Sequence, residues 1–150
     1  ANGGNIGIGI TAPSEKLTVA GVVTPGTDNT YTIGKNGARW SAVYAANGTI
    51  QTSDLRLKKN IQPLDRGLNV VLKMRPVMYQ WKDGSDTRLH VGLIAQEVQQ
   101  LVPEVVSGKE ATEKLGMNYA ELVPVLIRSL QQQQQKLKEL NVQIEVLSKK

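Results

Sequence analysis

Apolar residues near the end of the chain recur at alternating spacings of three and four. The residues on this helical face are Val123, Leu126, Leu130, Leu137, Leu140, Ile144 and Leu147, with Gln133 in one apolar slot. This heptad pattern is the seam of a left-handed coiled coil. Asn118 is a suitable N-cap and Glu121 stands at the capping-box spacing, so we expect one helix over residues 119–148. A helix with such a stripe needs partner helices to cover it.

Residues 53–118 mix helical and strand-like patterns. A helical face is formed by Leu64, Leu68, Val71 and Leu72. This helix should end near Arg75, because a proline follows. Alternating residues then predict a hairpin: Val77, Tyr79 and Trp81, a turn at Asp83-Gly84, and Leu89, Val91 and Leu93. A short helix over residues 95–101 and strands at 105–106 and 115–117 complete a small α+β domain.

Residues 1–52 have a different character and contain 9 of the 14 glycines. Apolar and small residues alternate over residues 5–10 and 16–19, which predicts short strands. Asn36-Gly37 and Asn47-Gly48 are turn signals, since both residue types tolerate positive φ. The apolar faces are too sparse to close a core within one chain. We therefore expect a fibrous β-structure in which several chains intertwine.

Composition narrows the classes of function. The chain of 150 residues has no cysteine, no phenylalanine and one histidine, His90. Thiolate metal sites are excluded and a Ser-His-Asp triad is disfavoured, so we expect no metal and no cofactor. The net charge is +5, but acidic residues are interspersed among the basic ones, which favours a solvated surface over nucleic-acid binding. The apolar runs fall short of the ~20 residues that cross a bilayer, so we expect no membrane partner.

Candidate chemistry lies where the composition changes, at Ser53 and, five residues later, Lys58. A neutral lysine can take the proton of a serine hydroxyl, whose oxygen then attacks a carbonyl. A solvated lysine keeps its proton, because the ordinary pKa of this side chain is about 10.4, whereas desolvation favours the neutral amine. Such a dyad should therefore wait for assembly. On spacing alone, the simpler interpretation is a turn or N-cap at Ser53-Asp54 and a surface lysine.

Several further motifs follow in order. They are SDLRLKKNI at residues 53–61, segments at 67–77, 79–82, 90–98 and 103–106, and the approach to the last helix at 119–124. Together they resemble the peptidase S74 family, the C-terminal intramolecular chaperones of phage tail spikes and tail fibres. The resemblance extends from Ser53 to about Leu147. Residues 5–17 resemble shaft sequences that precede this domain, and residues 39–44 resemble the segment before the cleavage point.

The resemblance implies a self-cleaving serine endopeptidase that acts once. Ser53 matches the family's nucleophile and Lys58 its base, and Asp54 would have an auxiliary orienting role. Ser53 would attack the carbonyl of Thr52, and water would hydrolyse the resulting ester. The chain would thereby be cut between Thr52 and Ser53.

The resemblance also implies an organisation and a place. Residues 1–52 would be the end of a β-structured shaft, residues 53–118 the chaperone and autoprotease domain, and residues 119–150 its coiled coil. The homotrimer would fold its own shaft in the host cytoplasm and be released, leaving the shaft in the virion tail fibre or spike.

Two alternatives and one motif stay open. A structural trimerisation cap would never cut, and Ser53 would be a turn residue. A membrane-anchored transcription factor with the same domain is disfavoured by the glycine-rich segment and the lack of an apolar span. Gln96 and Glu97 match a recurrent motif of the family. A place in the first turn of a helix explains them equally well, because the negative charge of Glu97 is favourable near the positive end of the helix dipole. The sequence leaves open whether the dyad forms within one chain and whether a nucleotide or ion assists release.

Overall fold

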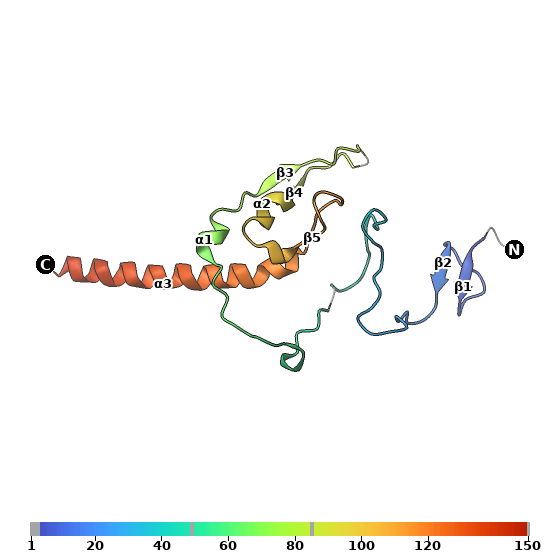
Figure 1. Cartoon of the computed structure of the whole chain (residues 1–150), viewed down its shortest axis with the longest axis horizontal. Helices are drawn as coiled ribbons and strands as arrows, with labels where there is room; N and C mark the ends of the chain where they lie inside the picture. The colour runs from blue at the N-terminus through green and yellow to red at the C-terminus, as the bar shows by residue number, and fades with distance from the viewer. Residues whose placement is uncertain (1–3, 49, 85, 150) are drawn as a thin grey trace. The chain divides into compact units, whose positions relative to one another are not determined.

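The computed structural model describes residues 4–48, 50–84 and 86–149 (Figure 1). Contacts between residues divide the chain into two compact units, one ending at Ser41 and the other beginning at Ala42. The division predicted between residues 52 and 53 therefore falls inside the second unit. It was placed at a cleavage motif rather than at a change in packing, and it stays a prediction.

The first unit contains a two-stranded parallel ladder. β1 (Ile6–Ile8) pairs with β2 (Leu17–Val19), so that both predicted strands are confirmed. The turn predicted at Asn36-Gly37 is confirmed as well, because the backbones of Lys35 and Ala38 bond to each other across it and Gly37 has a φ of 79°. The turn predicted at Asn47-Gly48, in the second unit, runs into residue 49, which lies outside the described residues. Over residues 4–41 no side chain is buried, so this unit has strands but no core.

The second unit is the predicted small α+β fold with a long C-terminal helix. Its elements are η1 (Leu55–Leu57), α1 (Leu68–Val71), β3 (Val77–Tyr79), β4 (His90–Gly92), α2 (Ala95–Gln99), η2 (Pro103–Val105), β5 (Val106–Ser107), β6 (Gly116–Met117), η3 (Tyr119–Glu121) and α3 (Leu122–Ser148). β3 pairs antiparallel with β4, and β5 pairs antiparallel with β6. The predicted hairpin is confirmed, but the turn begins earlier than expected. Trp81 lies outside the strand because its carbonyl accepts the N–H of Gly84 at 3.3 Å.

Helix α1 begins at Leu68, later than the predicted pattern from Leu64. Gly67 precedes this start, and a Cβ there would clash with Oε1 of Gln132 on α3. A larger residue would require the Gln132 and Arg128 side chains to move, and the N–H of Leu68 donates to the same oxygen at 2.7 Å. The start of α1 therefore lies in contact with α3.

Helix α3 also begins later than predicted, at Leu122 instead of residue 119. The ring of Pro124 would clash with the carbonyl of Ala120 in a continuous α-helix, so the chain forms the tighter turn η3 first. Asn118 caps that turn by accepting the N–H of Ala120 at 3.2 Å. Its amide donates to the Glu121 carboxylate at 3.0 Å, so the capping signal is real but acts on η3.

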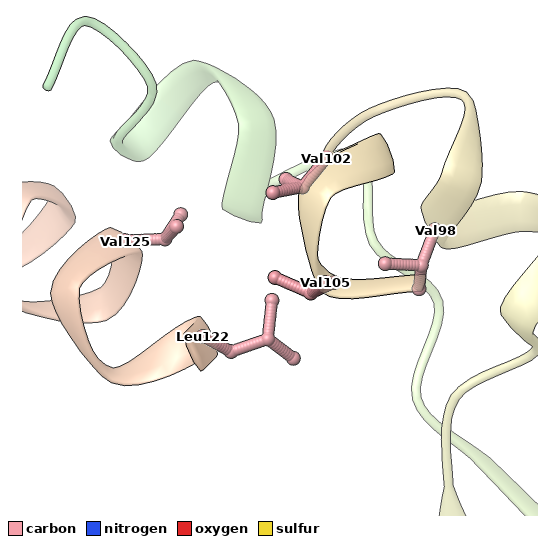
Figure 2. Close-up of a cluster of buried hydrophobic side chains, with 5 residues drawn as sticks. All are labelled: Val98, Val102, Val105, Leu122 and Val125. Carbon is pink, nitrogen blue, oxygen red and sulfur yellow. The ribbon is translucent and has the colours of Figure 1, made fainter. Parts of the chain in front are cut away.

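A small core joins α2, η2 and α3. Figure 2 shows its five side chains pointing toward one another: Val98, Val102, Val105, Leu122 and Val125. Valine and leucine fill the space because the chain has no phenylalanine. α1 lies against the N-terminal half of α3, whereas the C-terminal half of α3 extends past the rest of the unit with every described side chain exposed (Figure 1). Among the described residues no helix has the length and apolar content needed to cross a membrane.

Candidate active site

The predicted dyad is brought together by the single 3₁₀ turn η1. The turn is closed by two backbone hydrogen bonds, Leu57 N–H to Asp54 O and Lys58 N–H to Leu55 O, each 3.1 Å long. Because the turn folds the chain back on itself, the residues on either side of it meet. Lys58 Nζ lies 2.6 Å from Ser53 Oγ and donates a hydrogen bond to it.

This separation suits proton transfer between the two groups, which requires contact within about 3.2 Å. Both side chains are exposed, and they belong to the same chain. Thr52 and Ser53 lie in irregular, exposed backbone, so the peptide bond between them is accessible. The single chain therefore has the required distance but not the dry surroundings in which a lysine acts as a base.

The carboxylate of Asp54 is bound by Arg56 and not by the two dyad side chains. Asp54 Oδ1 accepts hydrogen bonds from the backbone N–H of Arg56 at 2.8 Å and from its Nε at 3.0 Å. Asp54 Oδ2 accepts a hydrogen bond from Nη2 of the same arginine at 2.6 Å. These side-chain and backbone hydrogen bonds from Arg56 hold the pKa of Asp54 below its ordinary value. Asp54 thus caps η1, and any orienting effect on Ser53 and Lys58 runs through the turn.

Sequence reasoning missed Arg56. An arginine two residues after an aspartate that opens a turn can hold both carboxylate oxygens with its planar fork, and that spacing was the available signal. Asn60 was missed too. Its φ of 54° lies in the left-handed region, where asparagine is tolerated, and it redirects the chain after the dyad.

Gln96 and Glu97 lie on α2, in a different contact from the dyad. The Glu97 carboxylate forms a two-pronged ion pair with Arg75, just before β3, and this pair raises the pKa of the arginine. Glu97 therefore links α2 to the start of the hairpin, whereas Gln96 is exposed. In the described ranges no group of three or more histidine, cysteine or acidic side chains is placed to hold a metal ion.

Comparison with known proteins finds a family model that matches the segment beginning at Ser53, the candidate nucleophile. Residues 53–107 match the family model Peptidase_S74, described as chaperone of endosialidase. This matched stretch of 55 of the 150 residues is named the S74 segment. The S74 segment includes η1, the hairpin and the core residues of α2 and η2.

Curated relatives of the chain are phage tail fiber proteins and a phage depolymerase. Side tail fiber protein pb1 of Escherichia phage T5 is 35% identical over 89 residues, which cover 55% of this chain and 6% of that protein. Depolymerase 1, capsule K3-specific, of Klebsiella phage KP32 is 38% identical over 85 residues, or 52% of this chain and 10% of the relative. Long tail fiber protein Gp37 of Enterobacteria phage K3 is 34% identical over 61 residues, which cover 39% of this chain and 5% of that protein. The chain thus spans a tenth or less of the length of these relatives.

A solved structure has the same fold. The carboxy-terminal domain of the bacteriophage T5 L-shaped tail fiber with its intra-molecular chaperone domain matches with a TM-score of 0.61 and 20% identity. The match covers 79% of this chain and 38% of that one. At this identity the likeness establishes the fold alone.

Proposed function

We propose that this chain is the end of a phage tail fibre or spike together with its intramolecular chaperone. The chaperone forms a homotrimer, folds the preceding shaft and then releases itself by cutting between Thr52 and Ser53. The observation that carries the proposal is the 2.6 Å contact between Lys58 Nζ and Ser53 Oγ, at the first residue of the S74 segment.

The trimer follows from the uncovered stripe of α3. Every apolar seam position from Val123 to Leu147 is exposed in the single chain. Water contact along such a stripe is unfavourable, and packing against copies of itself removes it. Three copies related by cyclic symmetry place their helices parallel, which brings the three preceding segments to the same end.

The first unit is a suitable client for such a chaperone. Its strands pair, but its apolar side chains, such as Ile6, Ile8 and Leu17, stay exposed within one chain. Interwound strands make contacts between chains, which form slowly because association and loop closure cost entropy first. A coiled coil raises the local concentration of the three shafts. Its later removal leaves a fibre that resists unfolding kinetically and stays in the virion, while the chaperone is left in the host cytoplasm.

The cleavage is an acyl shift followed by hydrolysis. The neutral amine of Lys58 takes the hydroxyl proton of Ser53, and Oγ attacks the carbonyl carbon of Thr52. The bond from that carbon to the Ser53 nitrogen breaks, and the nitrogen takes the proton back from the lysine. Water then hydrolyses the ester, which gives a Thr52 carboxylate and a free Ser53 amino group and hydroxyl.

Assembly supplies the missing desolvation in this proposal. Leu55 and Leu57 lie in the η1 turn between the two dyad residues and are 70% and 75% exposed in the single chain. Side chains of this kind are covered when a neighbouring chain packs on them, and water then leaves the adjacent lysine. Cleavage accordingly follows trimerisation.

Mass spectrometry of the purified chain tests the proposal. Wild type should give fragments ending at Thr52 and beginning at Ser53, and hydroxylamine should trap the ester as a hydroxamate on Thr52. Ser53→Ala and Lys58→Ala should stay intact, while the matched control Lys59→Ala should cut. Cleavage by Ser53→Ala, or an intact wild type whose trimer is confirmed by light scattering, would refute the assignment.

A trimerisation cap that does not cut is the second candidate. It is favoured by the exposure of Ser53 and Lys58 in the single chain. The same experiment separates the two, since a cap gives an intact trimer in wild type and in every variant.

A further inference from the structure

An apolar groove of about 460 Å³ opens between α1, β4 and the first turns of α3. Its walls include Met74, Pro76, Val91, Leu93, Tyr119 and Leu126, and Leu122 and Val125 of the core also line it. Val91 and Leu126 are exposed, so the groove is open to other molecules along the side where α3 presents its seam. Leu126 belongs to both surfaces, and the groove is therefore continuous with the stripe that the proposed trimer covers.

The heptad register shows which residue of a neighbouring helix comes nearest. With Val123 and Leu126 at the two seam positions, Leu122 flanks the seam on one side and Ile127 flanks it on the other. In a parallel coiled coil a residue at the position of Leu122 faces the residue five further on in the adjacent helix. Leu122 of one copy therefore faces Ile127 of the next.

The flanking positions are apolar only at this level of the helix. The later ones are polar: Ser129, Gln134, Lys136, Asn141, Gln143 and Ser148. Polar side chains are usual at positions that flank a coiled-coil seam. Of the two apolar flanking residues, Leu122 is buried within its own chain, whereas Ile127 is 51% exposed. Its apolar character is explained if it enters an apolar site on another copy.

We propose that the groove is the docking site for a second copy of this chain and that Ile127 of the neighbouring helix fills it. The inference rests on the proposed trimer and adds a contact to it. The body of each chaperone domain is thereby attached to the helix of its neighbour, and the groove residues on α1 and β4 become part of the subunit interface. The coiled coil alone would leave these residues in water.

Crosslinking tests the contact directly, because the chain has no cysteine of its own. The double variant Ile127→Cys with Val91→Cys, treated with a short bismaleimide, should give covalently joined chains on a denaturing gel. The matched control is Val142→Cys with Val91→Cys. Val142 is 60% exposed on the same helix but lies on the face away from the seam, so this pair should stay monomeric on the gel.

A second measurement does not depend on introduced thiols. Ile127→Ala should raise the concentration at which trimers dissociate by about tenfold or more, since each trimer loses three buried side chains. Val142→Ala should leave that concentration unchanged.

The outcomes separate this inference from the proposed function. Crosslinked chains from the Ile127 pair and weakened Ile127→Ala trimers support docking in the groove. A wild-type trimer with no crosslinking by that pair and an unchanged Ile127→Ala trimer overturns the docking alone. A wild-type chain that is monomeric in light scattering at every concentration overturns the trimer, and the docking with it.

Discussion

Helix α3 has one face that its own chain covers and another that it leaves in water. Leu122, Val125 and Ser129 are only 7%, 3% and 6% exposed, because α1, α2 and η2 lie over them. Leu130, Leu137 and Ile144 are 65%, 49% and 62% exposed although they are as apolar as Leu122 and Val125. The first face completes the fold of a single chain, and the second is available only to other chains. In the proposed trimer, one helix therefore couples folding to association, and the stability of the assembled domain would depend on chain concentration.

The largest expected effect comes from a charge in the exposed face. Leu137→Glu would place three carboxylates around the axis of the proposed trimer, where they repel one another and lose hydration. We expect monomers in light scattering and no cleavage products in mass spectrometry. Val142→Glu is the matched control and should stay trimeric. A stable Leu137→Glu trimer would show that this face is not the interface.

The buried face is tested by a smaller change in the monomeric background. With Leu137→Glu present, Val125→Ala should lower the free energy of unfolding by about 2 kcal/mol, since it leaves a cavity in the core. Leu130→Ala should change it by less than about 0.5 kcal/mol, because the side chain is already solvated. Urea unfolding measures both values. Equal losses from the two substitutions would remove the distinction between the faces.

The η1 turn, which brings Ser53 and Lys58 together, differs from both faces of α3 because hydrogen bonds and not burial stabilise it. Asp54→Ala removes the cap of η1 and should slow cleavage about tenfold, because Lys58 is then less often near Ser53. Asp54→Asn keeps an acceptor for the Arg56 N–H and should lose less. Arg56→Lys keeps the charge but not the planar fork, so it should resemble Arg56→Ala. Full activity of all four variants would mean that the turn forms without these bonds.

The smallest expected effect is a dependence of folding on acid. Hydrogen bonds from Arg88 hold the pKa of Asp86 well below its ordinary 3.8, and the backbone and then Arg66 lower the pKa of Glu104 from 4.5. Their contribution is complete above these ordinary values and is lost as the pH falls toward the lower folded-state values. The urea midpoint of the monomeric variant should be flat from pH 7 to pH 5 and fall below about pH 4.5. Asp86→Asn should reduce that fall, and an unchanged slope would argue against this pair.

The sequence by itself determined features that depend on neighbours along the chain. The period of α3, the alternation along the hairpin strands, the strands of the first unit and the spacing of Ser53 and Lys58 are all local patterns. Each reflects backbone geometry within a few residues, so composition and spacing were enough to predict it.

The tertiary structure decided the boundaries and the partners. Pro124 starts α3 late through the turn it forces before the helix, and α1 starts after Gly67, where α3 approaches it. The heptad pattern did not predict which apolar residues of α3 the chain itself buries. These are Leu122 and Val125, which lie outside the seam positions. Which face of a helix is covered depends on elements far away in sequence, because packing joins segments that periodicity treats separately.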